Sequence, residues 1–341
     1  MKNTIYLYRE LFSEQEKTIF QNAYFSAISF KYKSGIEAIK LTNEKGYLIV
    51  LPFYGQIIWD AHFNGHSLKM KNMFSEPKIG TTIVDTYGCF AFHSGLIRNG
   101  CPSPEDDHPL HGEMPCAQMD RAWIILEEDK LHIGGEVEYV KGFGDHYLAK
   151  PQVTLHANSS LFDIQMQVTN LANVEMPLQY MCHMNYCYEH GAKFEQNIPD
   201  NLIELRQTIP AHVKPTAKWL AFNEEIKTGH YQLSALENDE MYDPEIVFFM
   251  DNLQQYQANL EYRMHSPQGH CYLTKFSSHE FNYATRWILY NADQQVGAFV
   301  LPATCRPEGY LAAQKNGSLI LMKPNETRTF TVTTGIEETR I

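Results

Sequence analysis

Hydrophobic and polar residues alternate along most of this chain in short segments, a pattern that favours β-strands. Strand-like runs occupy residues 28–42, 46–55 and 122–140, and such runs continue through the C-terminal third to residue 336. Residues that favour turns separate these segments at intervals of about 8 to 12 residues. The pattern therefore predicts an all-β fold, and it suits a sandwich or a barrel.

Two of the expected turns are encoded by their own residues. Asn64-Gly65 is the dipeptide that most strongly favours a tight β-hairpin, and it lies between two alternating runs. The polar residues 127–130 separate two further strand-like runs in the same way. We therefore predict a hairpin at each position.

The N-terminal residues carry the clearest helix signal. Ser13 is followed three residues later by Glu16, which is the pattern of a capping box. We expect one short helix or turn there and assign residues 1–25 to an N-terminal segment with a short helix. Residues 26–341 form a single β domain in this interpretation, because no linker rich in Gly, Ser or Pro and no visible repeat divides them.

Two long stretches look irregular. Residues 81–118 are rich in Gly, Pro, Cys and His, and residues 223–244 are more polar. Loops as long as the first stretch tend to be functional or disordered. Its aromatic residues and histidines favour order, so we expect an ordered loop over a binding face.

The composition excludes some partners. The chain has 341 residues and a formal net charge of −12 at pH 7. Such a chain, with no basic stripe, lacks the charges that bind nucleic acid or an anionic membrane surface. Aromatic residues make up 13% of the chain, which suits packed β structure and also sugar binding, because flat rings contact the apolar faces of pyranoses.

The cysteines and the first residues indicate a compartment. Seven cysteines are scattered without a CxxC pair, and the first residues have neither an apolar stretch nor a cleavage site typical of secretion. No apolar run approaches the roughly 18 residues that cross a bilayer. We therefore expect a cytoplasmic protein with free thiols.

Two short motifs carry histidines suited to proton transfer. HPLHGE contains His111 directly before Gly112, a residue that permits a close backbone approach. MCHMNY has the alternation of a strand, so His183 and Asn185 share one face. An imidazole can donate or accept a proton near neutral pH. These residues are therefore candidates for a site, with a satisfied structural histidine or a buried hydrogen-bonded pair as the alternative.

Charged residues near these motifs extend the candidate set. Arg98 offers planar donors that suit sugar hydroxyls or a carboxylate. Glu308 in PATCRPEGY and Asp243 in MYDPEIVFF lie near predicted strand ends, and each could instead be a solvated loop carboxylate. The histidine spacings match neither HExxH nor an HxH pair, and no GxGxxG or Walker loop occurs. We therefore expect no metal site and no organic cofactor.

Taken in chain order, these motifs resemble the galactose mutarotase (aldose 1-epimerase) superfamily, and most closely its uncharacterised bacterial branch. The resemblance rests on Arg98-Asn99-Gly100, on Leu110-His111-Gly112, on the strand with His183 and Asn185, and on Pro302-Ala303-Thr304 near the end. It runs from about Tyr47 to the C-terminus. It implies one β-supersandwich that binds a small sugar on its concave face.

The resemblance also implies a mechanism. In mutarotases a glutamate removes the proton of the anomeric hydroxyl while a histidine protonates the ring oxygen, without a metal or organic cofactor. Carried over to this chain, His183 is the acid, and Arg98, His111, Asn185 and Asp243 bind substrate.

One position departs from the family pattern. The family's glutamate would stand just before Pro302, where this chain has Leu301. Glu308 is the nearest replacement further on, and we predict it as the catalytic base. The SPEDDHP stretch also departs from the simple pattern.

Three hypotheses follow. The first is an aldose 1-epimerase-like isomerase that acts on a hexose or modified hexose, as a monomer or homodimer. The second is a carbohydrate-binding or sensing protein that has lost the catalytic base. The third is another sugar isomerase, including one assisted by a metal.

Overall fold

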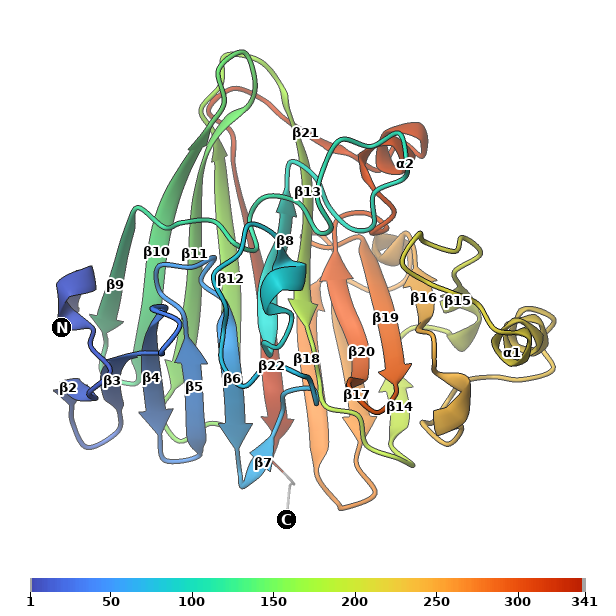
Figure 1. The fold of residues 1–341 in the computed structure, drawn as a ribbon, viewed down its shortest axis with the longest axis horizontal. Coiled ribbons are helices and arrows are strands. Elements are labelled where there is room, and N and C mark those ends of the chain that lie inside the picture. The colour runs from blue at the N-terminus through green and yellow to red at the C-terminus, as the bar shows by residue number, and fades with distance from the viewer. Residues whose placement is uncertain (1, 339–341) are drawn as a thin grey trace.

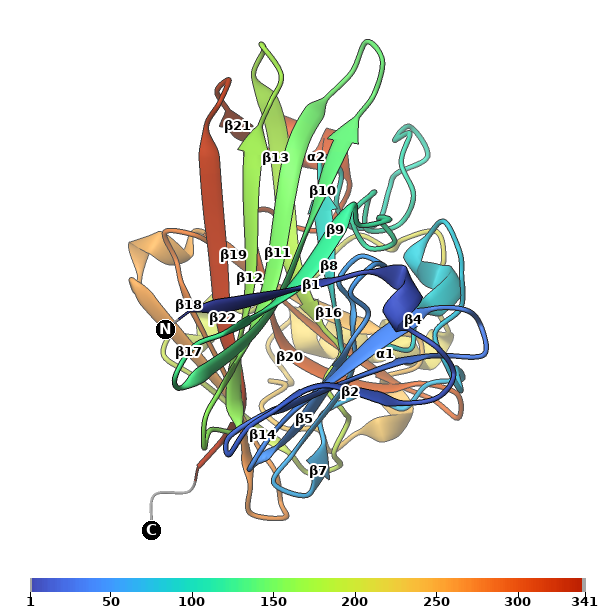
Figure 2. The same ribbon diagram turned by 90° about the vertical axis from the view of Figure 1, so that its left-hand side faces the viewer.

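Two large antiparallel sheets pack face to face in the computed structural model, which describes residues 2–338 (Figure 1, Figure 2). In spatial order, the nine-stranded sheet contains β1 (Asn3–Leu7), β9 (Arg121–Leu126), β10 (Lys130–Val140), β11 (His146–His156), β12 (Leu161–Asn170), β22 (Thr327–Glu337), β18 (Cys271–Ser277), β17 (Asn259–His265) and β14 (Lys193–Gln196). The thirteen-stranded sheet contains β15 (Glu204–Leu205), β16 (Ile246–Met250), β19 (Tyr283–Tyr290), β20 (Gln295–Ala303), β13 (Met176–Met184), β8 (Ala91–Leu96), β6 (Ile58–Phe63), β5 (Gly46–Val50), β4 (Glu37–Asn43), β3 (Ser26–Lys31) and β2 (Lys17–Gln21), with β7 (His66–Ser67) on β6 and β21 (Ile320–Met322) on β13. The predicted all-β supersandwich is confirmed.

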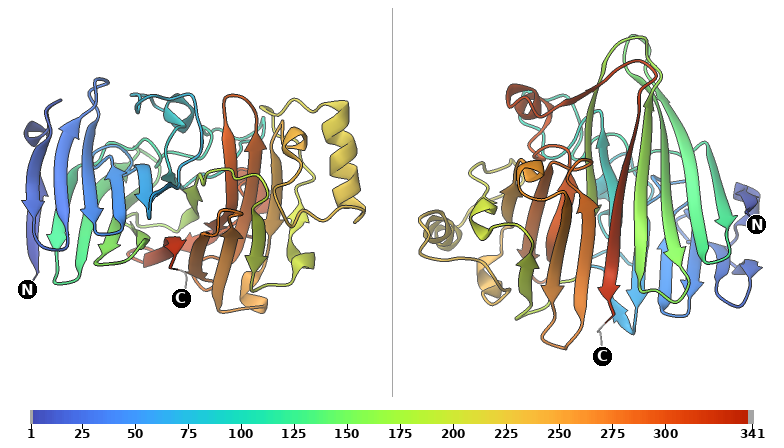
Figure 3. Two further views of the ribbon diagram at one scale, coloured as in Figure 1. Left: turned by 90° about the horizontal axis from the view of Figure 1, so that it is seen from below. Right: turned by 180° about the vertical axis from the view of Figure 1, so that it is seen from behind.

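Helical elements are few in the described residues. They are α1 (Ala217–Lys227), α2 (Tyr310–Lys315), and the short 3₁₀ helices η1 (Arg9–Leu11), η2 (Ile83–Thr86), η3 (Asp200–Leu202), η4 (Asp239–Met241) and η5 (Leu253–Gln255). Helix α1 lies at one end of the sandwich and the N-terminal strands lie at the other (Figure 3). Within residues 2–338, no helix combines the length and the apolar character that crossing a membrane requires.

The main core lies between the two sheets. Strand β12 shows why, since buried and half-buried residues alternate along its whole length and successive side chains of a strand point to opposite faces. Its buried residues Phe162, Ile164 and Met166 belong to the large apolar cluster that both sheets contribute to. Burial of each such side chain stabilises the fold by about 1.5–3 kcal/mol.

The local turn signals have mixed outcomes. Asn64 and Gly65 adopt φ values of 52° and 84° between β6 and β7, so the predicted hairpin is confirmed. The hairpin between β9 and β10 is confirmed as well. No helix follows Ser13, because residues 14–15 form only a bend and residues 17–21 pair with β3. The short N-terminal helix is η1, which lies earlier in the chain. Pairing with a neighbouring strand outweighs a local capping pattern.

Both stretches expected to be irregular contain regular structure. Residues 91–96 form β8, which pairs with β13 in the larger sheet, and residues 217–227 form α1. Every residue of β8 is buried, so it shows no alternation, as is typical of strands covered on both faces. The rest of residues 81–118 is an ordered loop, as predicted.

A second, smaller apolar cluster explains how this loop is held on the larger sheet. Ile83 of η2 packs there with Leu51, Trp59 and Phe92, on the sheet face turned away from the main core. In Figure 1 the segment that contains η2 lies in front of β8. The cluster anchors the loop and thereby places Tyr87, which follows η2, over the sheet.

Candidate functional site

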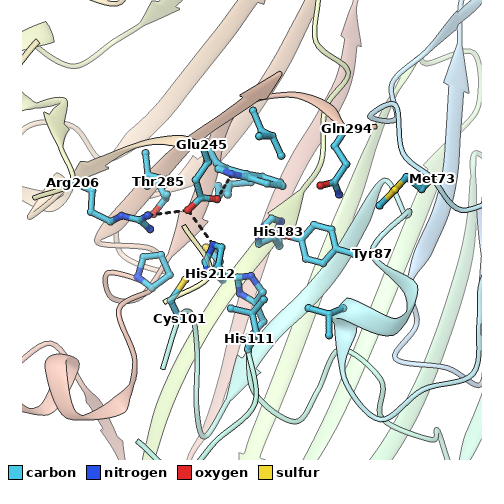
Figure 4. A pocket seen from close by; sticks show the side chains of 18 of the residues that line it. Met73, Tyr87, Cys101, His111, His183, Arg206, His212, Glu245, Thr285 and Gln294 are labelled. Carbon is cyan, nitrogen blue, oxygen red and sulfur yellow. Dashed lines mark hydrogen bonds and ion pairs between the residues drawn. The ribbon is translucent and has the colours of Figure 1, made fainter. Parts of the chain in front are cut away.

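A cavity of about 300 Å³ opens between the η2 loop and the larger sheet (Figure 4). A volume of this size falls at the lower end of the range for small-molecule sites. Its lining residues are Met73, Phe74, Val84, Tyr87, Cys101, Leu110, His111, Met181, His183, Arg206, His212, Glu245, Val247, Thr285, Trp287, Leu289, Gln294, Leu301 and Pro307. The cavity therefore combines an extensive apolar wall with a small set of convergent polar groups.

Strand β13 presents His183 to this cavity. Met181 and His183 are two positions apart and both line it, as the strand period of two requires. The His183 ring stacks on Phe92 with centroids 4.4 Å apart, and the Tyr87 hydroxyl lies 3.1 Å from its Nε2. Nδ1 of His183 is buried and makes no hydrogen bond to a residue of the described chain. Two aromatic neighbours therefore fix the ring, and its polar atoms remain only partly satisfied.

His111 reaches the same cavity from the loop. Its ring centroid is 4.8 Å from that of His183. Nδ1 lies 3.0 Å from the Ser94 hydroxyl, which itself donates to Oδ1 of Asn99 at 2.5 Å. Since the hydroxyl has one proton, its oxygen accepts from Nδ1–H of His111. Nε2 of His111 is then left as a hydrogen-bond acceptor.

The backbone at His111 needs the glycine that follows it. His111 and Gly112 both have positive φ values, of 64° and 81°. A Cβ atom at Gly112 would lie 1.9 Å from the carbonyl oxygen of Arg98, far inside van der Waals contact. The close backbone approach predicted at this glycine is confirmed, and it sets the direction of the His111 side chain.

Burial keeps both histidines neutral. It lowers the pKa of His111 to about 3. Burial also lowers the pKa of His183 well below its ordinary value, and the neighbouring His111 adds to this effect. At neutral pH each ring therefore carries one N–H donor and one acceptor nitrogen.

The carboxylate of the cavity belongs to Glu245, which directly precedes β16. It accepts hydrogen bonds from Nη2 of Arg206 at 2.8 Å and from Nε1 of Trp287 at 2.7 Å, and Nε2 of His212 lies 3.4 Å away (Figure 4). Burial alone would raise the pKa of Glu245, but hydrogen bonds and charges from His212 and Arg206 outweigh it and lower the pKa. Glu245 is therefore ionised, largely buried and held in one orientation.

Sequence reasoning missed Glu245. It stands two residues after Asp243, in the same MYDPEIVFF motif, and at the start of a fully buried strand. An acidic residue beside a buried apolar run is the signal that could have identified it. Asp243 itself is exposed and does not line the cavity.

Leu301 lines the cavity at the position where the resemblance places a glutamate. It is buried in β20, opposite Thr285 of β19. Oγ1 of Thr285 is buried and has no hydrogen-bond partner among the described residues. This part of the wall is therefore apolar except for one unsatisfied hydroxyl.

The remaining predicted site residues lie outside the lining of the cavity. Glu308 accepts a hydrogen bond from the Thr208 hydroxyl at 2.6 Å. Asn185 is buried and donates to the backbone oxygen of Cys89 at 3.0 Å. The structure thus brings together His111 and His183 and places neither Glu308 nor Asn185 with them.

Arg98 also lies away from the cavity. Its guanidinium stacks on the ring of Tyr310 at 3.9 Å, and Nε is 3.7 Å from the Asp107 carboxylate. This carboxylate belongs to the SPEDDHP stretch. Arg98 therefore connects that stretch to α2. Among residues 2–338, no three His, Cys, Asp and Glu side chains are grouped so that they could hold a metal ion.

Several solved structures share this fold at low sequence identity. A Klebsiella pneumoniae protein proposed to be an aldose 1-epimerase has a TM-score of 0.81 and 14% identity, over 98% of this chain and 91% of that chain. A galactose mutarotase-like protein of Clostridium acetobutylicum has a TM-score of 0.61 and 13% identity, over 93% and 100%. A galactose mutarotase related enzyme of Lactobacillus acidophilus has a TM-score of 0.58 and 9% identity, over 89% and 98%.

These likenesses confirm the resemblance to the galactose mutarotase superfamily at the level of the fold. No protein of curated function matches the chain. Residues 33–336 match the model of a family described as a domain of unknown function, DUF4432. The chain therefore belongs to the DUF4432 family and has a galactose mutarotase-like fold.

Proposed function

We propose that this protein binds a hexose or modified hexose in the cavity and interconverts its anomers, as an aldose 1-epimerase-like isomerase. The observation that carries the proposal is the convergence of His183, His111 and Glu245 on one cavity of suitable size. Proton transfer at a sugar anomeric centre needs an acid and a base that are both fixed in place. The mutarotase-like fold supports the same assignment.

The proposed reaction moves two protons and needs no cofactor. Ionised Glu245 takes the proton of the anomeric hydroxyl while the protonated form of His183, which burial makes scarce at neutral pH, gives a proton to the ring oxygen and becomes neutral. The bond between C1 and the ring oxygen breaks, and C1 becomes a carbonyl carbon. After rotation about C1–C2, the ring hydroxyl attacks the other face of the carbonyl, and both protons return. Each group contributes about 10²–10⁴-fold in such catalysis.

The other lining residues fit a sugar in this mechanism. His111 accepts a hydrogen bond from a hydroxyl at Nε2, the nitrogen that Ser94 leaves unused. The apolar wall, with Trp287 and Leu301, contacts the C–H faces of the pyranose. Arg206 and Trp287 hold the Glu245 carboxylate, so that it does not reorganise during the reaction.

Loss of catalysis with retained sugar binding is the second candidate function. Two observations favour it: Leu301 stands where the family has its glutamate, and the pKa of Glu245 is lowered, which weakens it as a base. In this case the cavity serves carbohydrate binding or sensing. The cytoplasmic location and the monomeric or homodimeric state stay predictions.

Saturation-transfer NMR on equilibrated anomers of a hexose panel tests the proposal. Transfer between the α and β anomeric protons should be faster with the protein than in buffer for at least one sugar. If no sugar exchanges faster, while one of them raises the thermal unfolding temperature, the binding function holds instead. If neither effect occurs for any sugar, both candidate functions fail.

A further inference from the structure

A second cavity, of about 490 Å³, lies on the other side of the same strands that form the first. Thr285 and Trp287 of β19 line the first cavity, and Arg286 between them lines the second, as alternation along a strand requires. Phe194 and Gln196 of β14, in the nine-stranded sheet, line it from across the sandwich. The second cavity therefore lies between the edges of the two sheets, near α1.

Arg286 carries a charge that no carboxylate contacts. Its side chain is 2% exposed. Nε donates to the backbone oxygen of Phe299 at 3.0 Å, and Nη2 donates to Oε1 of Gln196 at 2.9 Å. Its guanidinium lies over the Phe194 ring, 4.1 Å from the centroid, and within residues 2–338 it makes no hydrogen bond through Nη1 and no ion pair. Burial lowers the pKa of Arg286 only to about 10, so the guanidinium is charged at neutral pH.

A buried charge with only neutral partners is unfavourable, and arginine is almost never fully buried unless it is paired. Asp200, the nearest acidic residue of the cavity lining, compensates the charge of Arg286 poorly. Asp200 is exposed, and its two carboxylate oxygens accept from the amides of Gln196 at 2.6 Å and Gln232 at 3.2 Å. Water screens the charge of the exposed Asp200 carboxylate, whereas water has little access to the buried Arg286 guanidinium.

We propose that the second cavity binds the carboxylate or phosphate group of a small polar metabolite, with Arg286 as the charge partner of that group. The guanidinium presents planar donors that match two oxygens of such an anion. The lining residues Asn201, Tyr231 and Gln232 offer hydrogen bonds to the rest of the ligand. This proposal is independent of epimerase activity in the first cavity.

The alternative is a purely structural arginine. The pairing of β19 with β20 shifts register between Thr285 and Trp287, and Arg286 could serve only to satisfy the backbone oxygen of Phe299 there. A structural arginine would bind no anion. Binding therefore separates the two roles, whereas stability would not.

Calorimetric titration of the full chain with inorganic phosphate, D-glycerate and glycerol 3-phosphate, none of which is a hexose, tests the proposal. At least one of these probes should bind saturably, and the identity of the probe that binds distinguishes a carboxylate ligand from a phosphate ligand. Arg286→Met should weaken that binding by roughly tenfold or more, because it removes a charge-assisted hydrogen bond.

Two further variants keep the result interpretable. Ser234→Trp places a large side chain at an exposed position of the cavity lining, and it should also abolish binding even if Arg286→Met does not fold. Arg206→Met alters the first cavity and should leave binding unchanged. Three results would overturn the proposal. They are the absence of saturable binding by all three probes, binding that survives Ser234→Trp, and binding that only Arg206→Met removes.

Discussion

Glu245 and Leu301 line one cavity from the two strands that flank β19. Glu245 directly precedes β16, and Leu301 lies in β20. Leu301 lies opposite Thr285 of β19, at the position where the resemblance to mutarotases places a glutamate, whereas Glu245 is held by Trp287 of that same strand. The carboxylate of the cavity thus comes from the start of β16 and not from position 301 of β20.

Replacement of Glu245 tests its proposed role as base. Glu245→Gln keeps the shape of the side chain and removes the charge, so we expect anomer exchange to slow by about 10²–10⁴-fold. Saturation-transfer NMR on the sugar that the wild-type protein turns over measures the change. Glu308→Gln is the matched control, because Glu308 contacts Thr208 and does not line the cavity. This control substitution should change the exchange rate by less than about twofold. A slow Glu308→Gln variant beside an active Glu245→Gln variant would return the base to Glu308.

A carboxylate at position 301 should partly replace the one at position 245. In the Glu245→Gln background, Leu301→Glu places a carboxylate where the resemblance expects it, and we expect the exchange rate to recover by about tenfold or more. Leu301→Gln in the same background controls for size and polarity. Equal rates in the two double variants would show that position 301 does not reach the anomeric hydroxyl.

Substitution of Gly112 should cost more stability than substitution of Gly35. Both Gly112 and Gly35 have positive φ, but only at Gly112 would a Cβ clash with backbone, whereas Gly35 has nothing within 4 Å. Both substitutions to alanine cost about 1–2 kcal/mol for the left-handed backbone. Gly112→Ala should cost about 1–3 kcal/mol more and should also displace His111. Urea unfolding of the two variants measures the difference, and equal losses would contradict the clash.

The buried histidines should make the protein sensitive to mild acid. The folded-state pKa of His111 is about 3, below its ordinary value of 6.5, so the folded protein excludes a proton that the unfolded chain binds. The resulting stability is fully present above about pH 6.5 and is lost as pH falls towards 3, at about 1.4 kcal/mol per pH unit. Other buried histidines such as His93 act in the same direction.

The His111→Asn variant isolates one of these contributions. Between pH 7 and pH 5 it should lose about 2 kcal/mol less stability than the wild-type protein, since asparagine does not titrate. Urea unfolding of both proteins at pH 5, 6 and 7 gives the two pH profiles. Parallel profiles would mean that His111 is not protected from protons in the folded state.

Much of the fold was predictable because its signals are local. The hairpin at Asn64-Gly65 needs only two residues that tolerate positive φ, and the alternation in β12 needs only contact with one core face. Strand β8 escaped prediction because it is buried on both faces and so lacks alternation. The helix expected after Ser13 failed because residues 17–21 find a strand partner that a capping pattern does not reveal.

The amino-acid sequence by itself determined the strands, the two histidine motifs and the absence of a glutamate at position 301. Only the tertiary structure decided which carboxylate lies with His111 and His183 in one cavity. Glu245 becomes the carboxylate of the site because pairing of β15, β16 and β19 brings Arg206 and Trp287 to it from distant parts of the chain. A local motif specifies which side chain a position carries and which face of a strand it occupies. The contacts that keep a buried carboxylate ionised and fix its orientation arise only when separate strands pair.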